Sequence, residues 1–215
     1  MSFYLQLQSD TESERQALIG TEMIQRTFNG EIELADYARF LGQAYHHVKH
    51  TVPLLMSVGA RLGEDKEWLR SAVAEYIEEE IGHQEWILND IAACGFDKEK
   101  VRNSSPNFET ELMVSYAYDL VNRINPVGFF GMVLVLEGTS VNLADSAADR
   151  IKNLLSLPER AFSYLRSHGS LDQEHIKFLE SLIDRFDDPE DQQLITRSAQ
   201  VFYRLYRGVF ESVKH

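Results

Sequence analysis

The chain contains a single cysteine, Cys94, among its 215 residues. One cysteine excludes an internal disulfide and any metal cage built from several thiolates. Basic residues are also few, because 21 Lys and Arg stand against 34 Asp and Glu and leave a net charge of −13. Nucleic acids and anionic membrane surfaces are bound by clustered basic residues, and the sequence has no such cluster. We therefore expect neither as a partner.

Long apolar runs and leader-type segments are missing as well. Even the stretch around Phe129 is divided by glycines and by Glu137, so it falls short of the roughly 20 consecutive apolar residues of a membrane span. The first residues, MSFYLQLQSDTESERQ, lack the basic start and apolar core of a signal peptide. We expect a cytoplasmic protein that acts away from membranes, with residues 1–215 forming a single domain.

Proline is rare, and four of the five prolines stand where we expect a helix to begin. Apolar residues recur at helical spacing along nearly the whole chain, and no run alternates as in a strand. Thr11 with Glu14 predicts a capping box, and Pro53 predicts a kink. The predicted fold is all-α, one bundle of about seven or eight helices with short loops. The expected helices cover about 11–29, 36–63, 66–93, 105–125, 126–154, 158–168, 170–186 and 189–215.

One carboxylate interrupts the most apolar part of the chain. Glu137 follows PVGFFGMVLVL, a run that begins at Pro126. An ionised carboxylate buried without a partner costs several kcal/mol, so Glu137 requires a neutralising group. An arginine in the core or a bound metal ion would each meet this requirement.

The segment EYIEEEIGHQEW places Glu80 and His83 at i, i+3 on one face of a helix. This is the spacing by which a carboxylate and an imidazole reach one metal ion in helical bundles. Glu79 is an alternative to Glu80. A charged, solvated helix face explains the same short motif.

The segment HGSLDQEHIKF places His168, Asp172 and His175 at i, i+4 and i+7, on one stripe if the segment is helical throughout. Burying three polar groups together requires a shared partner. A surface helix capped by Ser170 is the alternative explanation.

Taken together, the three segments supply a set of nitrogen and oxygen donors that suits iron or manganese better than structural zinc or calcium. A carboxylate that bridges two divalent ions would account for Glu137. A glycine adjoins each segment and leaves room for a ligand: Gly82, Gly138 and Gly169. The predicted metal ligands are Glu80, His83, Glu137, His168, Asp172 and His175.

The segments that carry these residues resemble the heme-oxygenase-like di-iron oxidases, also described as iron-containing redox enzymes. The resemblance covers roughly residues 35–185, through YARFLGQAYHHVKHTVPLLMSVGARL, EEEIGHQEWILNDIAACGFD, VLEG and HGSLDQEH. It implies a heme-oxygenase-like bundle in which the six residues hold two Fe(II)/Fe(III) ions, with manganese as the alternative metal. It also implies dioxygen as co-substrate and a small organic substrate, such as a fatty acid, an amino acid or an amine.

One helix departs from the family pattern. Some members place a further carboxylate on the helix corresponding to residues 36–62, where this chain has Tyr45, His46, His47 and His50. His46 and His50 are spaced i, i+4 and are further candidate ligands. Neighbouring residues of a helix point about 100° apart, so we expect at least one of these histidines to face solvent. Tyr45 is expected in the pocket wall or the core.

Other functions on the same bundle stay open. A thiaminase-like (TenA) hydrolase would use Cys94 as nucleophile, and a heme oxygenase would use His47 as axial ligand. A non-catalytic helical binding module would keep the polar cluster as structure. Phe129, Phe130, Met132 and Trp86 are candidates to line a substrate pocket. The sequence leaves the substrate and the oligomeric state open, a homodimer included.

Overall fold

The computed structural model describes residues 1–170 and 172–213, and it describes side chains outside the segment 168–175. Nearly all of these residues are helical, and none of those described lies in a strand. The all-α prediction is confirmed.

The α-helices are α1 Phe3–Asp10, α2 Glu12–Ile19, α3 Glu22–Asn29, α4 Leu34–Val48, α5 Thr51–Arg61, α6 Glu67–Glu80, α7 His83–Ala93, α8 Lys98–Arg102, α9 Phe108–Asp119, α10 Phe129–Leu155, α11 Ser163–Ser170, α12 Asp172–Ile183 and α13 Pro189–Ser212. A π-helical turn, Leu120–Ile124, and a 3-10 turn, Pro126–Gly128, connect α9 to α10.

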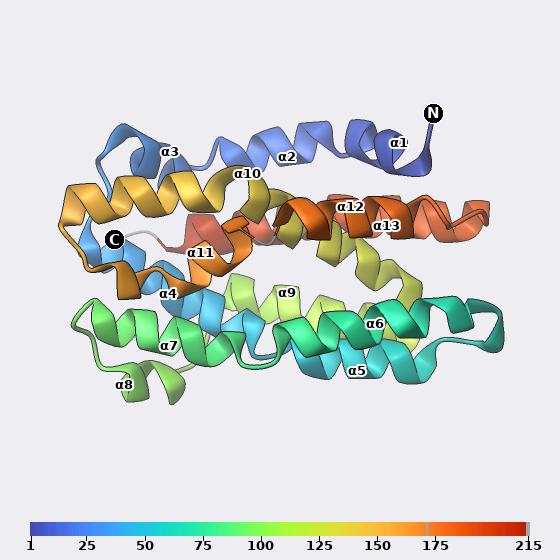
Figure 1. The fold of residues 1–215 in the computed structure, drawn as a ribbon, viewed down its shortest axis with the longest axis horizontal. Helices are drawn as coiled ribbons and strands as arrows, with labels where there is room; N and C mark the ends of the chain where they lie inside the picture. Colours follow the sequence, from blue (N-terminus) through green and yellow to red (C-terminus); the bar gives the residue numbers. More distant parts are fainter. Residues whose placement is uncertain (171, 214–215) are drawn as a thin grey trace.

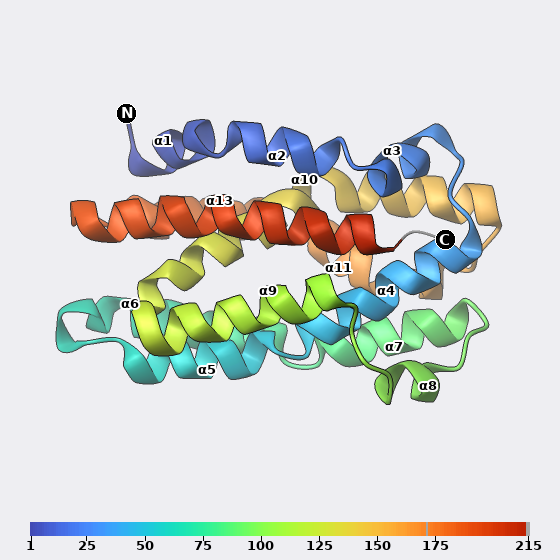
Figure 2. The ribbon, with the colours of Figure 1, turned by 180° about the vertical axis from the view of Figure 1, so that it is seen from behind.

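Figures 1 and 2 show α1, α2 and α3 end to end along one edge of the molecule, and α5, α6, α7 and α8 along the opposite edge. Helices α10, α12 and α13 run between these two edges. Helix α13 packs against α2, α9 and α10, while α10 packs against α11 and α12 as well. Because α10 and α13 are covered by helices on several sides, their facing residues form the middle of the core.

The chain forms more helices than the seven or eight predicted, because several predicted helices are divided. The predicted helix over 11–29 divides into α2, which begins directly after Thr11, and α3. A further helix, α1, precedes them, with the side chain of Ser2 as its cap. The hydroxyl of Thr11 donates to the main-chain oxygen of Leu7 over 2.8 Å, so it is used by the preceding helix. The capping box predicted at Thr11 is wrong for this reason.

The predicted helix over 36–63 divides into α4 and α5 at Lys49 and His50. Pro53 lies in the first turn of α5, where a backbone N–H has no partner inside the helix. Proline has no N–H to donate to the carbonyl of Lys49 four residues earlier, so the helix is interrupted at Lys49 and His50, before Pro53 rather than at it.

The predicted helix over 66–93 divides at Ile81 and Gly82, between α6 and α7. Gly82 has a φ of 99°, a backbone conformation that side-chain-bearing residues rarely adopt. The break therefore depends on glycine, and it separates Glu80 from His83.

Helices α10 and α13 approach each other closely at Gly131. A Cβ atom added to Gly131 would lie 2.6 Å from the main-chain nitrogen of Ala199 and 2.8 Å from the oxygen of Ile195. The hydroxyl of Ser198 donates to the main-chain oxygen of Gly128 over 2.7 Å and joins the two helices at the same level. This contact fixes the part of α10 that precedes Glu137.

The segment Pro126–Leu155 is long and apolar enough to cross a membrane, with a mean hydropathy of 1.5 in its most apolar window. However, 61% of that window is buried inside the structure. A buried core helix passes the same test of length and composition, and α10 is packed as one.

Candidate functional site

A cavity lies among α4, α5, α6, α10, α11 and α13, and it encloses about 590 Å³ of empty space, including its opening. Apolar side chains such as Phe129 and Met132 form part of its wall. No Lys or Arg stands among the described residues that line it. Its main polar side chains are those of His47, Tyr76, Glu80, Glu137, Tyr164 and Tyr206. We call this space the carboxylate cavity.

Glu137 reaches the carboxylate cavity because of its position along α10. Met132, Val133, Leu136 and Glu137 recur at helical spacing and all line the cavity. Atom Oε2 of Glu137 is inaccessible to solvent. The apolar run that precedes Glu137 therefore delivers its carboxylate into the interior of the bundle.

Glu80 and His83 meet although the helix between them is broken. Nδ1 of His83 lies 3.1 Å from Oε2 of Glu80, and His83 is buried. Glu80 lines the carboxylate cavity, whereas Glu79 is absent from its lining, which favours Glu80 over the alternative. The prediction of one continuous helix face was wrong, but the turn at Gly82 keeps the two side chains in contact.

Of the histidines on α4 and at its end, His47 alone lines the carboxylate cavity. It is 1% exposed, and its ring lies edge-on to that of Tyr206 with centroids 5.8 Å apart. His46 is also buried, but its Nε2 lies 2.9 Å from the Ser104 hydroxyl, and His50 lies 3.1 Å from the Tyr118 hydroxyl. His46 and His47 are buried, whereas His50 is half-buried and alone of the three keeps part of its surface in contact with solvent.

Burial and nearby charge act on the pKa values of these histidines outside the cavity. Burial, followed by the charge of Lys49, lowers the pKa of His46 to about 4. The same causes lower the pKa of His50. Both rings are therefore neutral at physiological pH.

Three tyrosines complete the polar lining, and sequence reasoning missed them. Burial raises the pKa of Tyr76, Tyr164 and Tyr206. The charge of Glu137 raises the pKa of Tyr76 further, and the charge of Glu80 raises that of Tyr164. All three side chains are therefore neutral phenols that can donate a proton or a hydrogen bond. The sequence could have indicated Tyr76, because it lies four residues before Glu80 on the same helix face. No local pattern in the sequence indicates Tyr206.

Three predicted ligands lie outside the described side chains: His168, Asp172 and His175. Helices α11 and α12 carry them, and both helices pack against α10. Within the part of the chain whose side chains are described, no three of His, Cys, Asp and Glu form a group that could hold a metal ion.

Of the residues predicted to line a pocket, Phe129 and Met132 do so. Phe130 is fully buried in the core, with its ring 5.8 Å from that of Phe186. Trp86 is 37% exposed and covers the ring of His83, with centroids 4.3 Å apart. Tyr45 is buried in the core, which is one of the two places expected for it.

Cys94 is buried and does not line the carboxylate cavity. Burial, followed by the charge of Asp90, raises the pKa of Cys94 to about 11. A thiol with a raised pKa is a poor nucleophile, so the site does not support hydrolysis by a cysteine.

The donors around the cavity are of the chemical types that iron accepts, although those described do not by themselves form a metal-binding group. Carboxylates from α6 and α10 and imidazoles from α4 and α7 are nitrogen and oxygen donors of the type that non-heme iron prefers. Oε2 of Glu137 is inaccessible to solvent, and the described lining holds no Lys or Arg. A cation bound here would offset the charge of Glu80 and Glu137.

Three comparisons place these observations among known proteins. A family model described as "Iron-containing redox enzyme" matches residues 38–207. A search of curated proteins found no significant match. A domain of unknown function with a heme oxygenase-like fold from Shewanella denitrificans superposes with a TM-score of 0.89 at 23% identity, covering 99% of this chain and 92% of that one.

Two further solved structures show the same fold. The heme oxygenase of Leptospira interrogans superposes with a TM-score of 0.82 at 18% identity, covering 99% of this chain and 100% of that one. A TenA homolog from Pseudomonas syringae pv. tomato superposes with a TM-score of 0.81 at 12% identity, covering 98% of this chain and 92% of that one. At these identities the likeness establishes a heme-oxygenase-like fold, as predicted.

Proposed function

Because the chain belongs to the family of iron-containing redox enzymes, we propose that it is a non-heme di-iron oxidase or oxygenase that acts on a small organic substrate. The observation that carries this proposal is that Glu80 and Glu137, from separate helices, face one cavity whose described lining has no Lys or Arg. Two carboxylates in such a place are best explained by bound cations. Manganese is the alternative metal.

The proposed ligands are Glu80, His83 and Glu137 together with His168, Asp172 and His175. When bound, iron supplies the electrons that reduce dioxygen. Glu80 and Glu137 contribute the negative charge that offsets the cations, and the contact of His83 with Glu80 orients the imidazole. His47 is a further donor at the cavity wall, on the helix where some members of the family place a further carboxylate.

The remaining lining residues control water and protons. Phe129, Met132 and Val133 present apolar surface to the cavity and limit the entry of water. Tyr76 and Tyr206 hold a proton on the phenolic oxygen, because their pKa values are raised. They are therefore able to donate to oxygen atoms formed or bound in the cavity.

Anaerobic titration with Fe(II) tests the proposal. We expect about two irons per chain, followed by a transient visible absorption when oxygen is admitted. Glu137→Gln and Glu80→Gln are each expected to weaken iron binding by about tenfold or more. Glu78→Gln is the matched control, because Glu78 is exposed on the same helix as Glu80. A chain that takes up no iron at micromolar concentrations would instead be a non-catalytic binding module.

Heme degradation is the second candidate, because His47 is buried at the wall of the same cavity in a fold shared with a heme oxygenase. Added hemin would then give a Soret band that His47→Ala removes and Glu137→Ala leaves intact. We favour non-heme iron, because a single axial imidazole leaves the two carboxylates without a role.

A further inference from the structure

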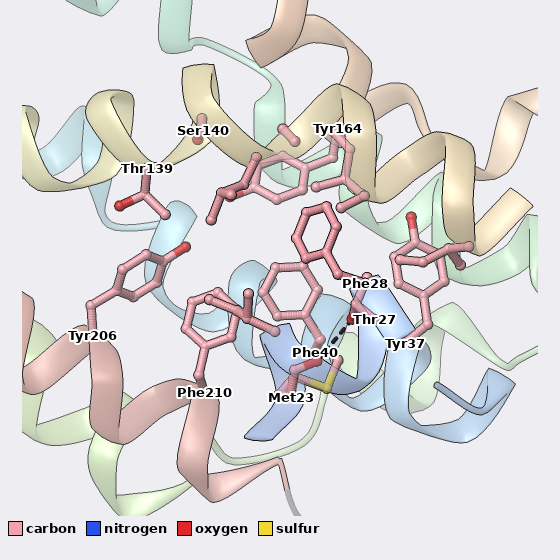
Figure 3. A pocket seen from close by; sticks show the side chains of 16 residues that line it. Met23, Thr27, Phe28, Tyr37, Phe40, Thr139, Ser140, Tyr164, Tyr206 and Phe210 are labelled. Carbon is pink, nitrogen blue, oxygen red and sulfur yellow. Dashed lines mark hydrogen bonds between the residues drawn. The ribbon is translucent and has the colours of Figure 1, made fainter. Parts of the chain in front are cut away.

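A second cavity adjoins the carboxylate cavity. It encloses about 650 Å³, including its opening, and it lies among α3, α4, α10, α11 and α13. Figure 3 shows Met23, Phe28, Phe40 and Phe210 around this space. Ala144 stands in the same wall, and no charged side chain occurs among the described residues that line it. We call it the apolar cavity.

Several hydroxyl groups in the wall of the apolar cavity already bond to the protein. The hydroxyl of Tyr37 donates to the main-chain oxygen of Ala161 over 2.8 Å. The hydroxyls of Thr27 and Thr139 donate to carbonyls four residues earlier in their own helices, over 2.9 and 2.6 Å. Because these hydroxyl groups already donate to main-chain oxygens, the wall that they form offers a ligand mainly apolar contact.

Three further hydroxyl-bearing side chains stand where the two cavities meet. Ser140, Tyr164 and Tyr206 line both cavities. In Figure 3, Thr139, Ser140 and Tyr206 lie together on one side of the apolar cavity, away from Met23 and Phe28. The two cavities thus share a hydroxyl-bearing wall, with apolar side chains on one side of it and the carboxylates on the other.

We propose that the substrate has an uncharged hydrocarbon or aromatic body that occupies the apolar cavity, while its polar, reacting end passes Tyr164 and Tyr206 to the carboxylate cavity. This inference rests on the proposed function, and it names the substrate class of the same site. Each apolar group transferred from water to this wall contributes binding energy, whereas a charge at the far end of the substrate finds no partner in the described lining. The proposal therefore predicts weak binding of small, fully polar amino acids.

A binding assay on the metal-free protein tests the proposal with the neutral, apolar fluorophore N-phenyl-1-naphthylamine. We expect its fluorescence to rise on binding, and we expect dodecanol, but not lysine, to displace it. Ala147 lines the apolar cavity, so the ring of Ala147→Phe fills part of it. This variant should bind the probe with an affinity lower by about tenfold. Ser146→Phe adds the same ring at an exposed position of α10 and should leave the affinity unchanged.

Ala144→Leu is a second, smaller filling variant, and circular dichroism establishes that each variant is folded. Equal affinity in the filling variants and in Ser146→Phe, or no probe binding at all, would overturn the proposal.

Fe(II) titration of the same variants separates the proposed function from the proposed substrate class. Unchanged iron uptake with lost probe binding is expected for Ala147→Phe. Probe binding without any iron uptake would refute the proposed function, and iron uptake without probe binding would refute the apolar cavity alone.

Discussion

Both carboxylates of the cavity share its lining with phenols. The charge of Glu137 acts on the pKa of Tyr76, and the charge of Glu80 acts on that of Tyr164. Burial is the larger cause of both shifts, so both phenols keep their protons at any physiological pH. A neutral phenol next to a carboxylate is able to orient it without adding a competing positive charge.

Replacing Tyr76 by phenylalanine removes only the hydroxyl beside Glu137. If the phenol positions the carboxylate, iron affinity in Tyr76→Phe should fall by about tenfold, in the range found for groups that orient metal ligands. Anaerobic Fe(II) titration measures this. Tyr118→Phe is the control, because the hydroxyl of Tyr118 contacts His50 away from the cavity. Equal affinities in the two variants would show that Tyr76 serves packing only.

At the scale of the elements, the turn between α6 and α7 decides how Glu80 and His83 meet. Glu80 is the last residue of α6 and His83 is the first of α7, with the positive φ of Gly82 between them. Sequence spacing identified the pair correctly as neighbours but placed it on one helix. The signal for the break was the glycine itself, which the periodicity of the apolar residues concealed.

The turn at Gly82 makes a stability prediction. A Cβ atom in this backbone conformation is strained, so Gly82→Ala should destabilise the protein by about 1–2 kcal/mol. Gly138→Ala is the matched control, because Gly138 lies inside α10 with nothing within 4 Å of an added Cβ. That change should be neutral or stabilise by about 0.5–1 kcal/mol. Urea unfolding followed by circular dichroism measures both, and a stable Gly82→Ala variant would contradict the argument.

At the scale of the whole molecule, the buried apolar side chains form one core cluster that extends from α1 to the end of α13. The proposed iron ligands come from α6, α7, α10, α11 and α12 and thus join separate parts of the bundle. A cation held among them therefore couples its binding to the stability of the fold, and part of the net charge of −13 would be offset when it binds.

Iron should accordingly raise the melting temperature. At a free Fe(II) concentration about 100 times its dissociation constant, binding adds about 2.7 kcal/mol to the stability of the folded state. For a chain of this size that corresponds to a rise of about 5–10 °C. Differential scanning calorimetry under anaerobic conditions measures the shift, which a chelator should reverse. Glu78→Gln should keep it and Glu137→Gln should lose most of it; an equal shift in both would point to iron bound elsewhere.

The sequence by itself determined the fold class, because helical periodicity and capping depend on residues close together in the chain. It also singled out Glu137, since one carboxylate in an apolar run needs a partner wherever it folds. Only the tertiary structure decided that His47, rather than His46 or His50, reaches the cavity of Glu80 and Glu137. The same is true of Tyr206, which enters the cavity wall from the last helix. Those choices depend on how distant helices cross, and no local pattern records the crossing.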